Sequence, residues 1–565
     1  MGRRKIPYGI SNYKEIVREN FLYVDKTRFI QELEQLSTKY AVFLRPRRFG
    51  KTLLVSTLQN YYDRNNRDIF SELFGHTYIG SHKTKLANSY YVMRFNFSGL
   101  STENMEQLIA SFKKSVEDTI IDFETDYKFN IGYDKNELQP ARLLGTYLTQ
   151  VRPYTRKNVY IMVDEYDHFA NALLYNKEVF EAVTGKDGFV RQFYEVLKVH
   201  TEKDCINRIF ITGVTSLTLD SFTSGFNISK NVSMFPVLNQ MVGFTEEETR
   251  ALIKDAGVVD DEETMRLLKD NYNGYLFHQK LSAATERVYN SNMILYFLDE
   301  YQIYGKIPTK MIDPNIRSDY NKLASMFTLF DDEGERQRVI EDIMSDKGMD
   351  TEIVTNFDFS LPFEQKDFLS LLFYLGLLTI KEEGHIFDVI LQPPNAVIRD
   401  VYYQYYANYL KINEVEKRTA VYNIAAKNDF TELNALITNI LKTHSNEDYR
   451  QFDEARLKSV FLSCFSNQGL FLVKSEYPSQ GRKIDIALFD QRLRDKRVKY
   501  NYLIELKYIK KSQANEASVA VIKEKAISQM KEYLNLDEFK ADARIKGVIY
   551  IVAKDQILCF DEVNK

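Results

Sequence analysis

The feature that most constrains the fold of this chain is a short loop between an apolar run and a helical segment. Residues 40–44 read Tyr-Ala-Val-Phe-Leu, which is typical of a buried strand, and residues 53–58 can begin a helix directly after Gly50-Lys51-Thr52. The unpaired amides of a first helical turn and the helix dipole together attract an anion into such a loop. The order strand, loop, helix therefore predicts a phosphate site in an α/β fold.

In a phosphate loop the lysine reaches the outer phosphates of a nucleotide and the next hydroxyl binds Mg²⁺, so we expect these roles for Lys51 and Thr52. Arg45 stands where the usual pattern has glycine, which leaves the motif incomplete at its first position. A Gly-Lys-Thr triplet by itself is common by chance, so the prediction needs a second half of the site. The loop residues that we expect to contact the nucleotide are Arg45, Pro46, Arg47, Arg48, Phe49, Gly50, Lys51 and Thr52.

A second apolar run, residues 159–165, ends in two acids and supplies that second half. We expect Asp164 to hold Mg²⁺ through water and Glu165 to orient or deprotonate the attacking water. The alternative is a core strand that merely ends in solvent-facing acids. A third run, residues 208–215, ends in hydroxyls, and Thr212 either senses the terminal phosphate or is present for its β propensity.

Predicted strands and helices alternate around these motifs. Residues 90–97 form another predicted strand, and residues 105–126 and 138–154 have helical spacing. This alternation is the signature of a parallel sheet covered by helices, in which ligands bind at the carboxyl ends of the strands. We therefore expect a P-loop NTPase sheet over residues 1–240.

The middle of the chain contains two smaller predicted modules. Thr245 and Glu248 form a capping-box pattern, and the helical periodicity that follows predicts a helical lid over residues 241–350. Such a lid can report the state of the nucleotide to the rest of the chain. Residues 351–412 read as a helix followed by two strands, which resembles a winged-helix module. The turn between these strands is acidic, so a structural or domain-coupling role is favoured over DNA binding.

The C-terminal part, residues 413–565, carries a second group of charged residues on predicted strands. Glu505 and Lys507 share one face of their strand because they are two residues apart. If Asp485 lies alongside, two carboxylates and an ammonium group converge, and such oxygen ligands suit Mg²⁺ or Mn²⁺. A metal there would bind a phosphate oxygen, and Lys507 would position or activate a water. The alternative is that these residues form no site, because charged residues at this spacing line the outer face of many strands.

A run of cations follows the strand that carries Asp485 and supplies local positive charge. It either grips phosphates or forms a solvated hairpin tip. Its members are Arg492, Arg494, Lys496, Arg497 and Lys499.

Five strings spread over nearly the whole chain carry a resemblance to a known family. They are RPRRFGKT at 45–52 and residues 23–27, 163–167, 212–215 and 272–275. They closely resemble a bacterial family of AAA-ATPase-like proteins, whose members usually carry a C-terminal nuclease-like domain of the PD-(D/E)XK superfamily. In that family the loop also opens with Arg-Pro-Arg-Arg, so Arg45 looks like a family trait. The resemblance implies an NTPase fold, a preference for ATP and a restriction-endonuclease-like α/β fold at the C-terminus.

The resemblance extends to the C-terminal charged residues. Asp485 followed by Glu505-x-Lys507 resembles the PD-(D/E)XK core, and residues 481–485 match the Gly-Arg-x-x-Asp entry of that family. It also implies a catalytic role for Gln529, which falls on the helix that the family places after this strand. Glu476 is a further candidate acid.

Composition limits the remaining possibilities. The net charge of −4 argues against a generally basic surface, so any contact with DNA has to come from local patches. The cysteines Cys205, Cys464 and Cys559 suggest neither a disulfide framework nor a zinc site and fit a reducing cytosol. No apolar run is long enough to cross a membrane, so we expect a cytoplasmic protein without a membrane partner.

The leading hypothesis is an ATP-controlled, metal-dependent nuclease that acts on DNA, with ATP and Mg²⁺ or Mn²⁺ as cofactors. The competing hypothesis is an ATP-driven switch or scaffold whose nuclease-like domain only binds nucleic acid or protein. A third hypothesis keeps the nuclease and makes the loop a nonhydrolytic ATP sensor. The choice between DNA and RNA stays open, and so does a homo-oligomer, since composite ATPase sites in related folds often lie between subunits.

Overall fold

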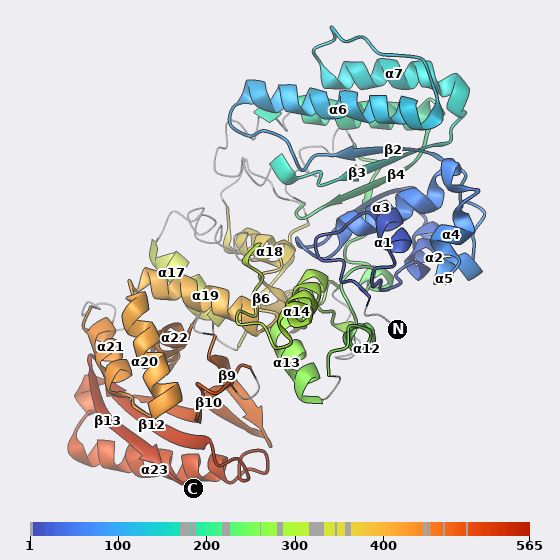
Figure 1. The fold of residues 1–565 in the computed structure, drawn as a ribbon. Helices are drawn as coiled ribbons and strands as arrows, with labels where there is room; N and C mark the ends of the chain where they lie inside the picture. The colour runs from blue at the N-terminus through green and yellow to red at the C-terminus, as the bar shows by residue number, and fades with distance from the viewer. Residues whose placement is uncertain are drawn as a thin grey trace. The chain divides into compact units, whose positions relative to one another are not determined.

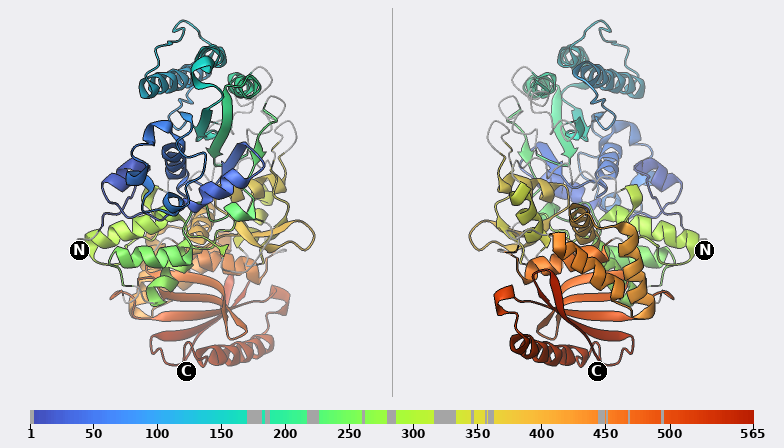
Figure 2. Two further views of the ribbon diagram at one scale, coloured as in Figure 1. Left: turned by 90° about the vertical axis from the view of Figure 1, so that its right-hand side faces the viewer. Right: turned by 90° about the vertical axis from the view of Figure 1, so that its left-hand side faces the viewer.

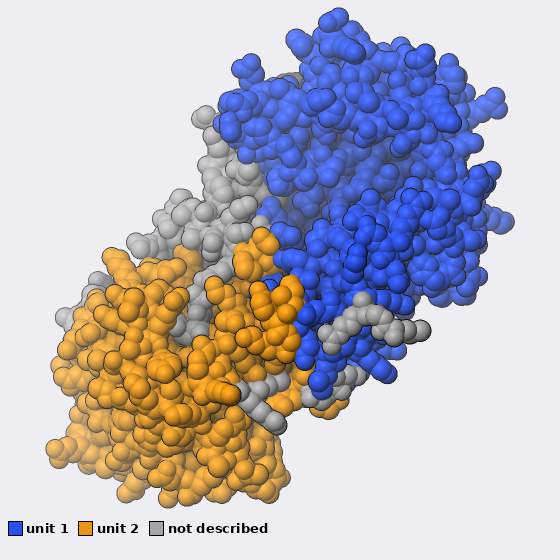
Figure 3. All heavy atoms as spheres, viewed as in Figure 1, with its two compact units in different colours: residues 1–260, 273–302, 350–391 blue, residues 261–272, 303–349, 392–565 orange. Residues whose placement is uncertain are grey.

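The computed structural model describes residues 4–169, 182–183, 188–216, 226–259, 262–278, 286–315, 333–344, 347–355, 357, 363–443, 449, 452–466, 469–492 and 495–565. The chain forms two compact units, which Figure 3 distinguishes by colour. Unit 1 consists of residues 1–260, 273–302 and 350–391, and unit 2 consists of residues 261–272, 303–349 and 392–565. The predicted division into four domains is finer than these two units, and its boundaries stay a prediction.

A parallel five-stranded sheet forms the centre of unit 1 (Figure 1). Its strands are β1 (Tyr40–Leu44), β2 (Tyr91–Asn96), β3 (Val159–Asp164), β4 (Ile206–Gly213) and β5 (Lys230–Asn231), in the order β2-β3-β4-β1-β5. Neighbouring strands all pair in parallel. Every residue of β3 is buried, which explains its continuous apolar run, because helices cover both faces of such sheets. The predicted parallel α/β sheet is confirmed.

Helices lie on both sides of this sheet. α6 (Met105–Tyr127) and α7 (Pro140–Thr155) lie on one side, and α3 (Lys51–Tyr62) lies on the other (Figure 1). The side chain of Asn104 caps α6 by accepting a hydrogen bond from the Gln107 amide. Other described helices wholly or mostly in this unit are α1 (Tyr13–Arg18), α2 (Arg28–Gln35), α4 (Phe70–Phe74), α5 (Tyr78–Ser81), α10 (Phe189–Glu202), α12 (Glu246–Asp255), α14 (Ser291–Tyr304) and α18 (Gln365–Tyr374), with 3₁₀ turns at Arg64–Asn66 and Pro236–Leu238.

The start of the predicted lid and the predicted wing both fall in unit 1. Thr245 caps α12 and the Glu248 carboxylate accepts from the Thr245 amide, so the predicted capping box is present. After α18, Gly376 adopts a φ of 77° and the chain turns into β7 (Thr379–Glu383) and β8 (Val389–Gln392). A third strand, β6 (Met349–Thr351), pairs with β8, so the wing has one strand more than the sequence predicted.

A mixed five-stranded sheet forms the centre of unit 2. Its strands are β9 (Phe471–Ser479), β10 (Arg482–Asp490), β11 (Asn501–Tyr508), β12 (Ile545–Ala553) and β13 (Gln556–Val563), in the order β13-β12-β11-β10-β9. Only the pairing of β11 with β12 is parallel among those described in this sheet. That parallel pair needs a crossover, and α23 (Glu516–Leu534) supplies it.

Helices also cover the sheet of unit 2. α23 lies along one face and packs Met530 and Tyr533 into a core shared with Ile484 and Leu503. α20 (Glu414–Lys427), α21 (Thr431–Thr443) and α22 (Glu454–Phe465) lie on the opposite side (Figure 2). The other described helices of this unit are α13 (Glu262–Tyr272), α17 (Glu333–Met344) and α19 (Ala396–Tyr409), with a 3₁₀ turn at Lys511–Gln513. None of the helices that the structure describes is both long and apolar enough to span a membrane.

Candidate active sites

Residues 45–52, here called the phosphate loop, connect β1 to α3. Arg48 and Gly50 adopt left-handed conformations with φ of 67° and 91°, the kind of backbone that gathers amides around an anion. Lys51 is buried, and its Nζ donates a hydrogen bond to the Pro46 carbonyl oxygen 3.1 Å away. Thr52 is half-buried in the first turn of α3. The side chain of Lys51, the first residue of α3, therefore folds back over the loop toward Pro46.

Arg45 is a buried support of this loop and is only 2% exposed. Its guanidinium donates hydrogen bonds to the carbonyl oxygens of Ser233 (2.7 Å) and Leu238 (3.1 Å), and it lies over the rings of Phe43 and Phe277. Burial lowers the pKa of Arg45 to about 9. The geometry gives Arg45 a packing role, and the predicted contact with a nucleotide stays a prediction.

We expect Arg45→Ala to lower the free energy of unfolding of unit 1 by about 3 kcal/mol, because it leaves buried carbonyl oxygens without a donor. Denaturant unfolding followed by circular dichroism measures the change. The matched control is Arg18→Ala, which removes an exposed arginine paired with Glu72 and should change stability by less than about 0.5 kcal/mol. Equal unfolding midpoints for the two variants would contradict the supporting role of Arg45.

Asp164 ends β3 and is fully buried at the carboxyl edge of the sheet. Its carboxylate accepts a hydrogen bond from the Thr212 hydroxyl at 2.8 Å and forms an ion pair with Arg94 at 3.0 Å. The parallel register brings these groups together, because Val163 pairs with Ile211 just before Asp164 and Thr212, and Asn96 of the strand that carries Arg94 pairs with Asp164. Sequence reasoning missed Arg94, since a single arginine in an apolar strand belongs to no motif.

Glu165 follows Asp164 with a φ of 55°, and its side chain is 20% exposed. One carboxylate oxygen lies 4.0 Å from Nδ1 of His168. The buried Asp167 carboxylate accepts hydrogen bonds from the amides of Val214 (3.0 Å) and Thr215 (2.7 Å). These bonds fix the segment after β3 to the end of β4, and Glu165 remains accessible at that edge.

The phosphate loop also contacts residues 275–277 and the first turn of α14. The ring of Phe49 packs edge-on against Tyr275 and Phe277, with centroids 4.8 and 5.5 Å away. The Arg48 carbonyl oxygen accepts a hydrogen bond from the Asn292 amide at 3.3 Å. A change in the conformation of the loop would therefore alter its contacts with residues outside the sheet.

Asp485 on β10 and Glu505 on β11 lie beside each other because the two strands pair in antiparallel register. Oδ2 of Asp485 accepts a hydrogen bond from the Leu506 amide at 2.8 Å. Glu505 is 1% exposed, and its Oε1 forms an ion pair with Nζ of Lys507 at 2.8 Å. The structure thus brings together the three residues predicted for this position, here called the carboxylate site.

The protonation states of the carboxylate site follow from its burial. Burial raises the pKa of Asp485 to about 6. Burial, and then the neighbouring charge of Asp485, raise the pKa of Glu505 to about 7. For Lys507 burial lowers the pKa, but the hydrogen bond and charge of Glu505 outweigh it and the net shift is upward. Lys507 is therefore a cation at neutral pH, which suits positioning a water or a phosphate better than accepting a proton.

The carboxylate site has an oxygen that is available to bind a divalent cation. Oε2 of Glu505 is buried and accepts no hydrogen bond from the part of the chain that the structure describes. An unsatisfied carboxylate oxygen beside a second carboxylate fits Mg²⁺ or Mn²⁺. Within the same described residues, no group of three or more His, Cys, Asp or Glu could hold a metal. Two protein carboxylates together with several waters are a ligand set that Mg²⁺ usually takes.

Sequence reasoning missed a third acid near this site. Glu454, the first residue of α22, has Oε1 3.5 Å from Nζ of Lys507, and its Oε2 accepts a hydrogen bond from the Tyr508 amide at 3.4 Å. Acids in the first turn of a helix are common for electrostatic reasons, so this position carried no distinguishing signal. The other candidate acid, Glu476, forms an ion pair with Lys458 of α22.

Gln529 lies on α23 and forms a hydrogen bond with Tyr533 of the same helix. Its side-chain amide donates to the Tyr533 hydroxyl, which in turn donates to the Lys483 carbonyl oxygen at 2.9 Å. This chain of bonds connects α23 to β10 two residues before Asp485. The arrangement favours a positioning role for Gln529, and the predicted catalytic role stays a prediction.

The predicted positive charge after β10 is partly neutralised. Arg492 and Arg497 both contact the Asp495 carboxylate, at 3.2 and 2.6 Å. Arg494 lies outside the described residues.

Two family descriptions match separate parts of the chain. Residues 7–223 match the family described as predicted AAA-ATPase, and residues 452–561 match the PD-(D/E)XK nuclease superfamily. The first match contains the phosphate loop and Asp164, and the second contains Asp485 and Glu505.

Two individual proteins are similar over longer stretches. An uncharacterized protein in the vnfD 5′ region of Azotobacter chroococcum mcd 1 is 25% identical over 563 residues, which cover 96% of this chain and 95% of that protein. The Walker-type ATPase PABY2304 of Pyrococcus abyssi aligns with a TM-score of 0.38 and 12% identity, over 71% of this chain and 98% of that one. Together with the sheet geometries, the family matches show that the chain joins an AAA-ATPase-like domain to a C-terminal domain of the PD-(D/E)XK nuclease superfamily.

Proposed function

We propose that this protein binds and hydrolyses ATP and thereby controls metal-dependent cleavage of DNA by its C-terminal domain. The observation that carries the proposal is the carboxylate pair of half-buried Asp485 and buried Glu505 beside the cationic Lys507. Burying two carboxylates side by side opposes folding, so such a pair points to a function that needs it. The phosphate loop gives the same chain a second phosphate-directed site.

The phosphate loop and the strand ends beside it offer groups suited to binding ATP. Lys51 and the first-turn amides of α3 would bind the phosphates, while Thr52 and Asp164 would hold Mg²⁺. Thr212 donates to Asp164 and so links β4 to the metal ligand. Glu165 would orient or deprotonate the attacking water, for which its partly exposed position is suitable.

The carboxylate site would act on a phosphodiester. Asp485 and Glu505 would hold Mg²⁺ or Mn²⁺, which when bound supplies Lewis-acid activation of the phosphate and of a water. Lys507 stays protonated and donates hydrogen bonds to the water or to a phosphate oxygen. Gln529 and Tyr533 keep the backbone of β10 in place before Asp485.

We also propose a cytoplasmic location and DNA as the macromolecular partner. The three cysteines are free thiols, as a reducing compartment favours. A homo-oligomer is proposed only from the composite sites of related ATPases.

The second candidate function is an ATP-driven switch or scaffold whose nuclease-like domain only binds nucleic acid or protein and does not cleave. One observation favours it: Lys507 forms ion pairs with Glu505 and Glu454, so part of the negative charge at the carboxylate site is neutralised without a metal. Weak metal binding there would leave a domain that holds nucleic acid or protein without cleaving.

Cleavage of supercoiled and linear DNA with Mg²⁺ or Mn²⁺, with and without ATP, tests the proposal. We expect metal-dependent cleavage whose rate changes with ATP, and we expect Lys51→Ala to remove the response to ATP but not the cleavage. No cleavage under any of these conditions would leave the switch or scaffold. If the cleavage rate is the same with and without ATP, the protein is a nuclease but ATP does not control it.

A further inference from the structure

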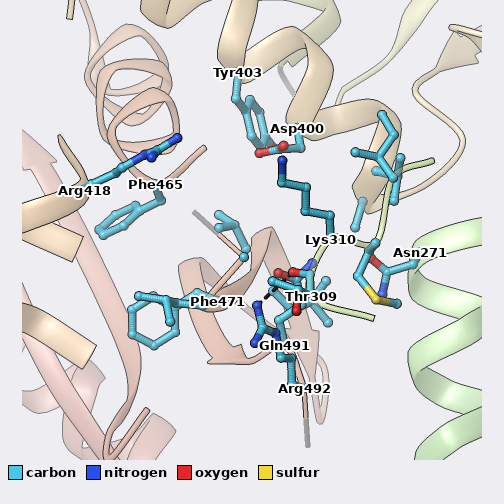
Figure 4. A pocket seen from close by; sticks show the side chains of 18 of the residues that line it. Asn271, Thr309, Lys310, Asp400, Tyr403, Arg418, Phe465, Phe471, Gln491 and Arg492 are labelled. Atoms are coloured by element: carbon cyan, nitrogen blue, oxygen red, sulfur yellow. Dashed lines mark hydrogen bonds between the residues drawn. The ribbon is translucent and has the colours of Figure 1, made fainter. Parts of the chain in front are cut away.

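Unit 2 contains a cavity of about 360 Å³ that is separate from the carboxylate site (Figure 4). Residues 309–312, α19, α20 and the ends of α22 and β10 contribute to its walls. Gln491 lines it six residues after Asp485, so the cavity lies about 20 Å along the strand from the carboxylate site. The volume is within the range of small-molecule sites in proteins.

The lining of this cavity has an excess of positive charge. Its charged side chains are Lys310, Arg418, Arg492, Arg497 and Asp400. Lys310 extends toward Asp400, whereas Arg418 reaches in from the opposite wall (Figure 4). Asp495 contacts both Arg492 and Arg497, so one carboxylate is shared by two guanidinium groups. The ligand that such a lining selects is an anion.

Arg492 is held in place before any ligand arrives. Its guanidinium donates a hydrogen bond to the Thr309 carbonyl oxygen at 2.8 Å and forms an ion pair with Asp495. Gly469 allows this close approach, because a Cβ there would lie 3.0 Å from the Thr309 oxygen and 3.6 Å from the guanidinium. Burial, and then the charge of Arg497, lower the pKa of Arg492, and a bound anion would offset the repulsion between the two guanidinium groups.

Four aromatic side chains are among the remaining lining residues. They are Tyr403, Tyr422, Phe465 and Phe471. Figure 4 shows Phe465 and Phe471 on the same side of the cavity as Arg418. Arg418 and Tyr422 are four residues apart on α20 and so share one face of that helix. Aromatic rings and guanidinium planes together are the surfaces on which nucleobases stack.

We propose that this cavity binds a nucleoside phosphate, with the phosphate on Arg418 and Arg492 and the base against the aromatic side chains. The ligand comes either free in solution or as the phosphorylated end of a single strand, since both present the same chemistry. The site is distinct from the phosphate loop, whose residues belong to unit 1, and it does not depend on nuclease activity.

Calorimetric titration of the full-length Lys51→Ala protein tests the proposal, because this background silences the phosphate loop. The probes are AMP, UMP, adenosine, inorganic phosphate and a 5′-phosphorylated tetranucleotide. We expect a nucleotide or the tetranucleotide to bind, and added Arg418→Ala to weaken it at least about tenfold by removing a charge-assisted contact. Lys427→Ala is the matched control, because it removes an exposed charge from the same helix outside the cavity.

The probes separate the outcomes. Binding of AMP or UMP identifies a free nucleotide, and binding of the tetranucleotide alone identifies a strand end. The proposal is overturned if neither binds at millimolar concentration, or if Arg418→Ala and Lys427→Ala bind equally well. It is also overturned if inorganic phosphate or adenosine binds as tightly as the nucleotide.

Discussion

Replacing Asp485 by asparagine should abolish metal-dependent DNA cleavage while leaving the fold of unit 2 intact. The asparagine keeps an oxygen that can accept the hydrogen bond from the Leu506 amide, so the local backbone retains its partner. It removes one of the two negative charges that would hold the cation. A loss of several kcal/mol of transition-state stabilisation corresponds to a fall in rate of about a thousandfold or more. Initial cleavage rates at saturating Mn²⁺ measure it.

The same substitution should stabilise the metal-free protein in a pH-dependent way. Burial raises the pKa of Asp485 from 3.8 to about 6, so the folded state binds this proton more tightly than the unfolded state. The contribution of protonated Asp485 to the free energy of unfolding is therefore fully present below about pH 4, and it is lost as the pH rises through about 6. At about pH 8 the ionised side chain opposes folding by roughly 3 kcal/mol, and asparagine lacks this penalty. Thermal unfolding in EDTA should show a more stable variant at about pH 8 and little difference near pH 4.

Asp537→Asn is the matched control, because it neutralises a carboxylate of the same unit whose side chain is 74% exposed. It should change neither cleavage nor stability appreciably. Cleavage at the wild-type rate by Asp485→Asn would reject Asp485 as a metal ligand. Loss of cleavage without any gain in stability at about pH 8 would instead reject the proposed penalty of burying its charge.

Both sites could be predicted in outline because their signals are local in the sequence. The apolar strand β3 ends directly at Asp164 and Glu165, and the loop begins where β1 ends. Glu505 and Lys507 share a face because of strand geometry alone. Placing Asp485 beside them required only that β10 and β11 be neighbours, which the structure confirms.

What the sequence could not predict are contacts between positions far apart in the chain. Arg94 reaches Asp164 across 70 residues, and Glu454 reaches Lys507 across 53. The burial of Arg45 depends on Ser233, which lies 188 residues later. No sequence spacing predicts these contacts, because tertiary packing alone brings the paired residues together. The nucleotide-sized cavity of unit 2 was missed for the same reason, since its walls come from separate segments.

Replacing Glu165 by glutamine should separate ATP binding from ATP hydrolysis. Glutamine keeps the shape of the side chain but cannot accept a proton, and it leaves Lys51 and the start of α3 unchanged. We therefore expect ATP to bind with nearly wild-type affinity while the steady-state hydrolysis rate falls at least about a hundredfold. Calorimetry measures the first quantity and phosphate release the second. Since the variant should remain in the ATP-bound state, its DNA cleavage should match that of the wild type with a nonhydrolysable ATP analogue.

Glu195→Gln provides the control for this experiment, because Glu195 is a partly exposed acid of the same unit that pairs with Arg191 on α10. Its hydrolysis rate should equal that of the wild type. If Glu165→Gln also hydrolyses ATP at that rate, another group activates the water and Glu165 only ends the strand. If the wild type itself binds ATP without hydrolysing it, the loop is a nonhydrolytic sensor. Any effect of ATP on cleavage would then have to come from binding alone, through the contacts of Arg48 and Phe49 with the segment around α14.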